Sequence, residues 1–362
     1  MIGSLTKAMA IGFALAMLLL GSDNAHAGTV EKNYISYLGA AWGPDGDTIY
    51  FLKQVVLKQK STGFLSGLTG GVQTEHSGIW FCKMNWDGSQ KQEICEMWPG
   101  QGASVDTQGG PVWMEVNTAT SNVVFGVEYG MGTVGIWVMG LDGKNLHRPF
   151  DLPWSDKEKW RGLHPSWNPD GTKLVYGEQA ETMRIAEWDL IKKERRQLTN
   201  GPRDEQPSWS PTGDWIVYMH CLHSDDNHKA FRIWLSRPDG SEQKPVVDEK
   251  DQPVHGWWPS WSPDGKAVGI TFDLLTLADL ATKKTQIIDP LPILGECLPW
   301  TFMGHHWGRR GWLLSSQGRV VFIDGTTKKA RLLALGGIYP TGTSSVDERW
   351  GIRPMDMEGK KR

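Results

Sequence analysis

The sequence predicts an all-β protein that folds as a single β-propeller of four-stranded antiparallel blades. The first observation is a recurring phrase with Pro, Ser, Trp, Pro and Gly at fixed places, found at 165–171, 207–213 and 259–265 and in a shorter form at 41–46. The second is that short alternating apolar stretches fill the space between the copies. Each unit must bury its apolar face against a neighbour, so such units are expected to pack around a ring.

Each copy shows the same elements in the same order. An inner strand ends at the Trp, a Pro- and Gly-containing turn follows, and an alternating strand such as 173–176 or 215–218 comes next. A third strand then closes on a second Asp-Gly pair, as at 142–143, and the fourth strand is brief, as at 196–199. Proline fixes φ and glycine allows positive φ, so these pairs are typical of the hairpin turns in a propeller blade.

The number of blades depends on how the degenerate copies are counted. The clear anchors are Trp42, Trp167, Trp209 and Trp261. Weaker copies begin at 111–113 and 306–311, and a truncated one covers 344–350. We predict seven blades, with six as the alternative, and a ring closed by N- and C-terminal strands, in which 33–38 completes the last copy.

The first residues have the features of an export signal. Lys7 precedes an apolar stretch over 8–20, and Ala25, His26 and Ala27 form a cleavage site of the small-x-small kind. We therefore expect a signal peptide over 1–27 and one propeller domain over 28–362, in an exported, soluble protein without a membrane span. The formal net charge of -3 gives no basic face for nucleic acid.

The cysteines predict one disulfide and exclude one cofactor. Cys82 and Cys95 lie on two strands joined by the turn at 87–90. If Gly88 and Ser89 form a two-residue loop, the two thiols lie directly opposite, within reach of a disulfide in an exported protein. The chain has no Cys-x-x-Cys-His, so it carries no covalently attached c-type haem of its own.

Polar groups are expected around the mouth of the central channel, on the loops that lead into the inner strands. These loops are 108–110, 161–164, 204–206, 255–258, Glu296 and 339–343. Such a ring is either a ligand site or a set of groups that cap neighbouring backbones, and capping is favoured. The candidates for a divalent metal are His164, His305 and His306, but no ligand spacing repeats, so no metal site is predicted.

Two insertions are candidates for partner contacts. One covers 53–77 and places Phe64, Leu65 and Leu68 on a Gly-rich segment. The other covers 247–258, and its proposed partner-facing residues are Asp248, Glu249, Asp251, His255, Trp257 and Trp258. Long loops in a compact repeat are often functional, and the alternative is simple variation in loop length.

The phrase Trp-Ser-Pro-Asp-Gly at 261–265, with Gln-Leu-Thr at 197–199, resembles TolB-like propellers, which are relatives of WD-repeat proteins. A narrower resemblance is to oligogalacturonate lyases, exported propellers with a manganese site of His and Gln residues and a β-elimination mechanism. His164, His305 and His306 are similar in kind to those ligands. The segment 339–344, where that family places further ligands, has neither His nor Gln.

The chain also resembles the haem-free propeller (beta) subunit of hydrazine synthase from anaerobic ammonium-oxidising bacteria, in length, leader, single-propeller design and tryptophan content. This resemblance implies a non-catalytic subunit in the periplasm or the anammoxosome lumen, with no cofactor of its own. Its partners would be haem c-bearing subunits that join nitric oxide and ammonium into hydrazine, and 247–258 would reach towards their active site. We favour this reading over the lyase, because the residues show no nucleophile–base pair.

Overall fold

A computed structural model gives the fold of the chain. It describes residues 29–60, 73–97, 112–127, 135–150, 164–179, 182–222, 230–271, 275–288, 305–316, 319–335 and 337–339. The expected signal peptide and the residues Phe64, Leu65 and Leu68 lie outside these ranges.

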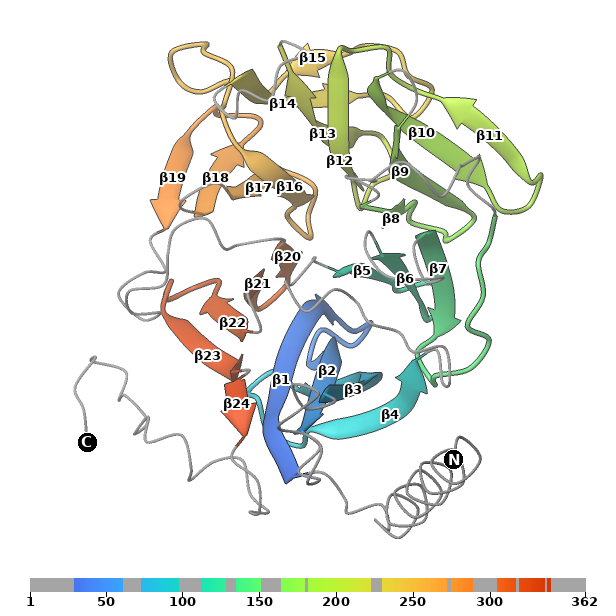
Figure 1. Cartoon of the computed structure of the whole chain (residues 1–362). Helices are drawn as coiled ribbons and strands as arrows, with labels where there is room; N and C mark the ends of the chain where they lie inside the picture. The colour runs from blue at the N-terminus through green and yellow to red at the C-terminus, as the bar shows by residue number, and fades with distance from the viewer. Residues whose placement is uncertain are drawn as a thin grey trace, which may run out of the picture.

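Six antiparallel sheets stand around a common axis, as Figure 1 shows. Blade 1 contains β1 (Thr29–Trp42), β2 (Thr48–Lys60), β3 (Gln73–Asn85) and β4 (Gln92–Met97). Blade 2 contains β5 (Val112–Asn117), β6 (Asn122–Val127) and β7 (Gly135–Gly140). Blade 3 contains β8 (Ser166–Trp167), β9 (Lys173–Gln179), β10 (Met183–Asp189) and β11 (Glu194–Gln197).

The remaining blades have four strands each. Blade 4 contains β12 (Arg203–Trp209), β13 (Ile216–Cys221), β14 (Phe231–Ser236) and β15 (Lys244–Pro245). Blade 5 contains β16 (Trp257–Trp261), β17 (Ala267–Thr271), β18 (Leu275–Asp279) and β19 (Thr285–Ile288). Blade 6 contains β20 (His305–Gly308), β21 (Gly311–Ser316), β22 (Arg319–Asp324) and β23 (Ala330–Leu335).

The leading prediction of seven blades is wrong, and the six-blade alternative is confirmed. Blade 1 is complete from the N-terminal part of the chain, so it needs no strand from 344–350 to fill it. The last described strand, β24 (Gly337–Tyr339), pairs antiparallel with β1 as a fifth strand of blade 1. The predicted pairing of N- and C-terminal strands is therefore confirmed, although it does not build an extra blade.

The repeated phrase makes the turn between the first two strands of a blade. The N–H of Gly171 donates to the carbonyl of Asn168 over 3.0 Å, and Asp170 Oδ1 accepts the N–H of Thr172 over 2.9 Å. Gly171 has a φ of 73°, where a side chain would be strained. The hydrogen bond holds the pKa of Asp170 below its ordinary value, together with the hydroxyl of Thr172.

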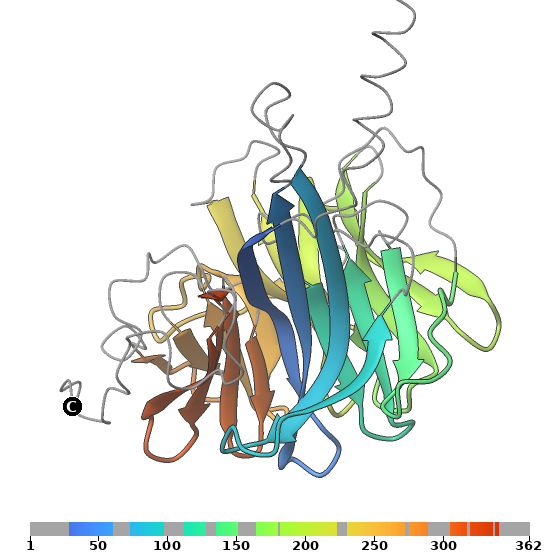
Figure 2. The same cartoon turned by 60° about the horizontal axis from the view of Figure 1, so that its bottom comes forward.

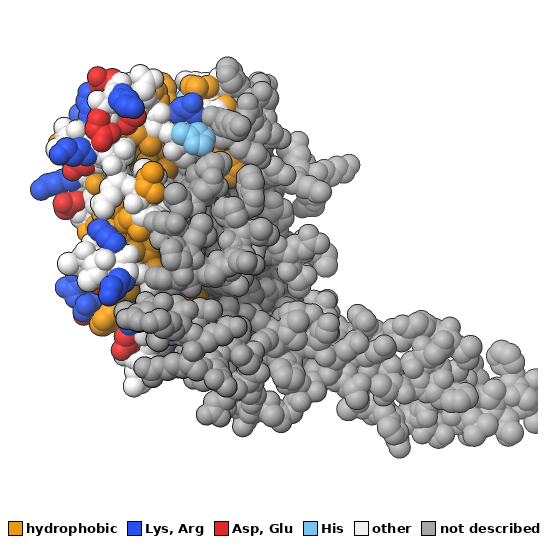
Figure 3. All heavy atoms as spheres, turned by 90° about the vertical axis from the view of Figure 1, so that its left-hand side faces the viewer, with side chains coloured by type: hydrophobic (Ala, Val, Ile, Leu, Met, Phe, Trp, Pro, Cys, Tyr) orange, Lys and Arg blue, Asp and Glu red, His pale blue; other side chains and the backbone are white. Residues whose placement is uncertain are grey.

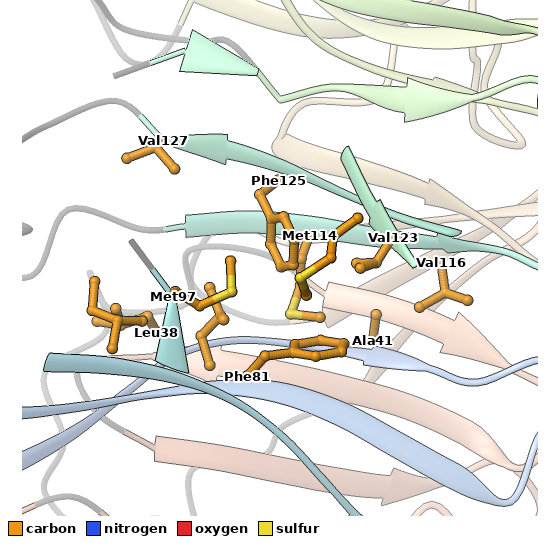
Figure 4. Close-up of a cluster of buried hydrophobic side chains, with 12 residues drawn as sticks. Leu38, Ala41, Phe81, Met97, Met114, Val116, Val123, Phe125 and Val127 are labelled. Atoms are coloured by element: carbon orange, nitrogen blue, oxygen red, sulfur yellow. The ribbon is translucent and has the colours of Figure 1, made fainter. Parts of the chain in front are cut away.

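The apolar core lies between blades rather than inside one of them. Figure 4 shows the cluster between blades 1 and 2, where the rings of Phe81 and Phe125 meet edge to face at 5.8 Å. The anchor side chains Trp42, Trp167, Trp209 and Trp261 are each buried in such an interface, as the sequence predicted. Each side chain of this size contributes several kcal/mol by burial, at about 25 cal/mol per Å².

Blade 1 differs from the others in the length of its strands. β1, β2 and β3 have 14, 13 and 13 residues, and β2 and β3 stay in register from the Thr48–Asn85 pair to the Lys60–Gln73 pair. Figure 2 shows them rising beyond the strands of the other blades. We call 29–36, 55–60 and 73–78 the arm. Much of the predicted insertion at 53–77 is therefore paired strand, because β2 and β3 simply continue.

The surface carries both signs of charge. On the side where blades 5 and 6 lie, Figure 3 shows basic and acidic side chains interspersed with apolar ones over the coloured part of the view. Within the described part of the chain, no helix is long and apolar enough to cross a membrane.

Candidate functional site

In blades 1 to 5, one position of the repeat lies where the inner strand comes close to the axis of the ring. It lies four residues before the residue whose carbonyl opens the first turn of the blade. In the described blades the position holds Gly39, Trp113, His164, Gln206 and Trp258. The strand register is irregular beside Gly39, Gln206 and Trp258. A bulge of this kind re-aims a side chain, and bulges are common next to functional sites.

Three of these residues have an unusual backbone. The φ angles of His164, Gln206 and Trp258 are 23°, 55° and 52°, and each residue precedes a proline. Residues before proline favour extended conformations, and a side-chain-bearing residue at positive φ is strained. Strain of this kind persists where the surrounding structure holds it, often at functional sites.

The side chains of opposite blades meet at the axis. The Trp258 ring of blade 5 stacks on the Trp113 ring of blade 2, with centroids 6.1 Å apart and an interplanar angle of 18°. The His164 ring of blade 3 lies edge-on to Trp258 at 4.5 Å and to Trp113 at 5.5 Å. Blades 2 and 5 are three steps apart in a ring of six, so Trp113, His164 and Trp258 fill the axis. We call these three residues the axial plug.

Two residues after this axial position, hydrogen bonds join the inner strands of neighbouring blades. The N–H of Trp167 donates to Glu115 Oε1 over 3.1 Å, and the N–H of Trp209 donates to Ser166 Oγ over 2.9 Å. Burial raises the pKa of Glu115 to about 7, against the hydrogen bonds from Ser166 and Trp167. Glu115 and Ser166 therefore cap the neighbouring blade. In the predicted ring of polar loops, Gln206 Oε1 does the same by accepting the N–H of Trp258 over 2.8 Å.

The same position in blades 5 and 6 is not hydrogen-bonded. Ser260 Oγ and His306 Nδ1 are buried without a hydrogen-bond partner. Burial lowers the pKa of His306 to about 4, so this imidazole is neutral at pH 7. The rest of the His306 ring keeps some exposed area.

The three candidate metal ligands do not form a described metal site. His164 belongs to the axial plug, and the backbones of His305 and His306 pair with Leu314 and Leu313 on β21. The His305 side chain lies outside the described atoms. Among the residues that the structure describes, no group of three or more His, Cys, Asp or Glu side chains could hold a metal ion.

The segment 247–258 folds back as a hairpin. Val246 donates its N–H to the carbonyl of Ile233, and the carbonyl of Val254 accepts the N–H of Ile233 over 3.0 Å. Both valines are buried in the interface between blades 4 and 5. The expected loop is therefore an integral part of these two blades.

The side chains predicted to face a partner have contacts within the chain. Asp248 Oδ1 accepts the N–H groups of Lys250 and Gln252, each over 2.9 Å. The remaining contacts pair Glu249 with Thr285, Asp251 with Lys283, the His255 backbone with Arg232, and the Trp257 ring with Phe231. Glu249 and Asp251 are exposed, so a partner could still reach them, whereas Trp258 belongs to the axial plug.

The predicted disulfide between Cys82 and Cys95 is absent, and both thiols are free. An irregularity in the ladder pairs Cys82 with Glu93 and Cys95 with Phe81, which turns the two sulfurs to opposite faces of the sheet. Cys82 packs towards blade 6 and Cys95 towards blade 2. Burial raises the pKa of Cys82 to about 12, so this thiol stays protonated and unreactive at pH 7.

Sequence reasoning missed two features near the axis. The sequence analysis begins a weaker copy at 111–113, whereas the anchor position of blade 2 is Val116 and Trp113 belongs to the axial plug. Counting back from the turn at Asn117 would have given this register. The second feature is His220, whose Nδ1 lies 2.6 Å from the buried Asp204 Oδ1 on the paired strand.

Comparisons with known proteins agree with this fold. No protein-family model matches the chain. The Tol-Pal system protein TolB of Francisella tularensis subsp. holarctica, in strains OSU18 and LVS, is 26% identical over 106 residues. That match covers 28% of this chain and only 23% of each relative's length.

Two solved structures are also similar. TolB from Acinetobacter baumannii superposes with a TM-score of 0.52 at 13% identity, over 86% of this chain and 66% of that one. A putative TolB from Agrobacterium tumefaciens gives 0.49 at 16% identity, over 85% and 98%. The Acinetobacter likeness supports the fold alone. The chain is thus a six-bladed β-propeller whose fold is similar to that of the Acinetobacter TolB.

Proposed function

We propose that this chain is an exported, non-catalytic interaction subunit that uses its propeller as a scaffold for other proteins. The observation that carries the proposal is the contrast between the axis and the arm. Trp113, His164 and Trp258 occupy the axis with the chain's own side chains. The arm instead extends paired backbone beyond the blades, where another protein can cover it.

The dimensions of the arm suit a docking role. From Tyr37 to Thr29 the strand adds eight residues, or about 25 Å at roughly 3.3 Å per residue. If only solvent covered a three-stranded arm of this length, its outer half would add little to the stability of the fold. A partner that packed on it would bury a large part of both faces.

For the partners we propose haem-containing subunits of a redox complex of the hydrazine synthase type. In this proposal the chain has no cofactor, haem c resides in the partners, and the complex lies in the periplasm or the anammoxosome lumen. The resemblance in length, leader and tryptophan content supports it. The hairpin at 247–258 would present Glu249 and Asp251 to the partner.

The alternative is an interaction protein of the TolB kind without haem-bearing partners. The 106-residue match to TolB favours this alternative. We do not pursue the lyase reading, because His164 packs edge-on against two tryptophan rings.

Purification of the tagged chain from its native source tests the proposal. We expect partners in a fixed ratio with a haem absorbance band. Envelope proteins without haem would favour the TolB-like alternative, and a clean monomer would contradict both.

A variant without the two segments that β2 and β3 contribute to the arm tests the contrast between the axis and the arm. Residues 55–78 are replaced by Asn-Gly, which joins the directly opposite Gln54 and Ile79 by a two-residue turn. The control replaces 190–193 by Asn-Gly between the opposite Asp189 and Glu194. We expect both variants to keep the propeller fold and only the first to lose its partners. If the first variant keeps its partners, the arm is not the docking site.

A further inference from the structure

Trp258 differs from the other two members of the axial plug in its burial. Trp113 and His164 are 8% and 3% exposed, whereas Trp258 keeps a larger exposed area. Of the three plug residues, Trp258 is therefore the one with the greatest contact with solvent.

The backbone of Trp258 is strained while its ring stacks on Trp113, which we call the closed arrangement. Its φ of 52° is combined with a following proline, Pro259, which disfavours this region. The N–H of Trp258 donates to Gln206 Oε1 over 2.8 Å instead of to the strand ladder. A change of conformation at Trp258 thus breaks one side-chain hydrogen bond and no ladder pair, and it releases the strain.

Contact across the axis holds the closed arrangement together. Stacking on Trp113 and the edge contact with His164 oppose the strain. Contacts between aromatic rings contribute a free energy comparable to the cost of one strained residue. Two terms of similar size and opposite sign are what a two-state element requires.

We propose that Trp258 is a movable gate on the axis of the ring. In the closed state its ring stacks on Trp113. In the open state the ring swings to the face of the propeller, and water and small solutes can pass along the axis beside Gly39, which has no side chain. This inference does not depend on which partners the protein has.

Fluorine NMR of the full protein labelled with 5-fluorotryptophan tests the gate. The resonances are assigned with Trp258→Phe and Trp113→Phe, and the fully buried Trp312 is the internal reference. We expect exchange on the microsecond-to-millisecond scale at Trp258 and, at the same rate, at Trp113, with none at Trp312. Sharp single resonances for both plug rings, or exchange at Trp258 that Trp113 does not share, would overturn the proposal.

A second variant tests the source of the open state. Pro259→Ala removes the steric cause of the strain in the closed state. The open population should then fall by about fivefold or more. An unchanged or larger open population in this variant would show that strain does not drive the gate.

Discussion

We call the interface between two neighbouring blades a joint. The joints between blades 2 and 3 and between blades 3 and 4 are stabilised differently from the joint between blades 6 and 1. The joints between blades 2, 3 and 4 use residues of the repeat itself. In each of them, a side chain beside the axis accepts a hydrogen bond from the backbone N–H of the next blade's anchor, as Ser166 Oγ does from Trp209. The bond from Trp209 to Ser166 is buried and neutral, so salt and pH in the neutral range hardly affect it, whereas the partly buried bond from Trp167 ends on the ionisable Glu115.

The closing joint uses charge. Arg309 Nη2 lies 3.0 Å from Asp47 Oδ2, and Arg310 pairs with the same carboxylate. The guanidinium groups of Arg310 and Arg331 lie 4.5 and 5.0 Å from the centroid of the Trp86 ring. Joints between consecutive blades can thus reuse one motif, whereas the joint between the two ends of the chain needs its own residues.

Removal of an interior anchor should have the largest effect. Trp209→Ala empties a buried site between blades 3 and 4 and should lower the free energy of unfolding by about 3–5 kcal/mol, measured by urea denaturation. Ile191→Ala, at a side chain that is 75% exposed, is the control and should change it by less than about 0.5 kcal/mol. Equal effects would mean that the interior joints do not limit stability.

Glu115→Gln should remove a pH dependence from one interior joint. The folded-state pKa of Glu115 is raised from 4.5 to about 7 by burial, so the folded state holds a proton that the unfolded state has lost. The free energy of unfolding of the wild type should therefore fall by on the order of 2 kcal/mol as the pH rises from 4.5 to 7. The variant should lack this fall in urea unfolding; a parallel pH profile would refute the assignment.

Ser166→Ala should weaken the adjacent joint by a smaller amount. It leaves the buried N–H of Trp209 without its acceptor, which should cost about 1–2 kcal/mol in urea unfolding. Ser241→Ala, in an exposed turn, is the matched control. An effect of the same size in the control would show that the inter-blade bond adds nothing.

Asp47→Asn should have the smallest effect, and one that depends on salt. The hydrogen bond from Arg310 lowers the pKa of Asp47, so its contribution is present above the unfolded-state pKa and lost as the pH falls through the folded-state value. Salt should lower the melting temperature of the wild type slightly more than that of the variant. Hydrogen exchange in β1 and β21 should rise in acid before exchange in β9 and β13.

The sequence predicted the features that are local. Pro, Asp and Gly fix the turns, and apolar anchors such as Trp167 and Trp261 fix the faces of the inner strands. The disulfide prediction is wrong because the turn does not form a two-residue loop at Gly88 and Ser89: the N–H of Asn85 donates to the carbonyl of Ser89, and Lys83 pairs with Gln92 instead of Ile94. The irregularity next to Cys82 then turns the two thiols to opposite faces. The contact between Trp113 and Trp258 joins opposite blades, so it depends on the blade count, which the pattern at 344–350 obscured.

The pairing of β24 with β1 sets an order on biogenesis. Residues 337–339 follow all six blades along the chain, yet they cover the edge of the first strand at 33–35. Until they arrive, that edge is open to other chains, and an exposed strand edge promotes aggregation. A product cut short before Gly337 would carry this open edge permanently, so residues 337–339 protect blade 1 from pairing with other chains.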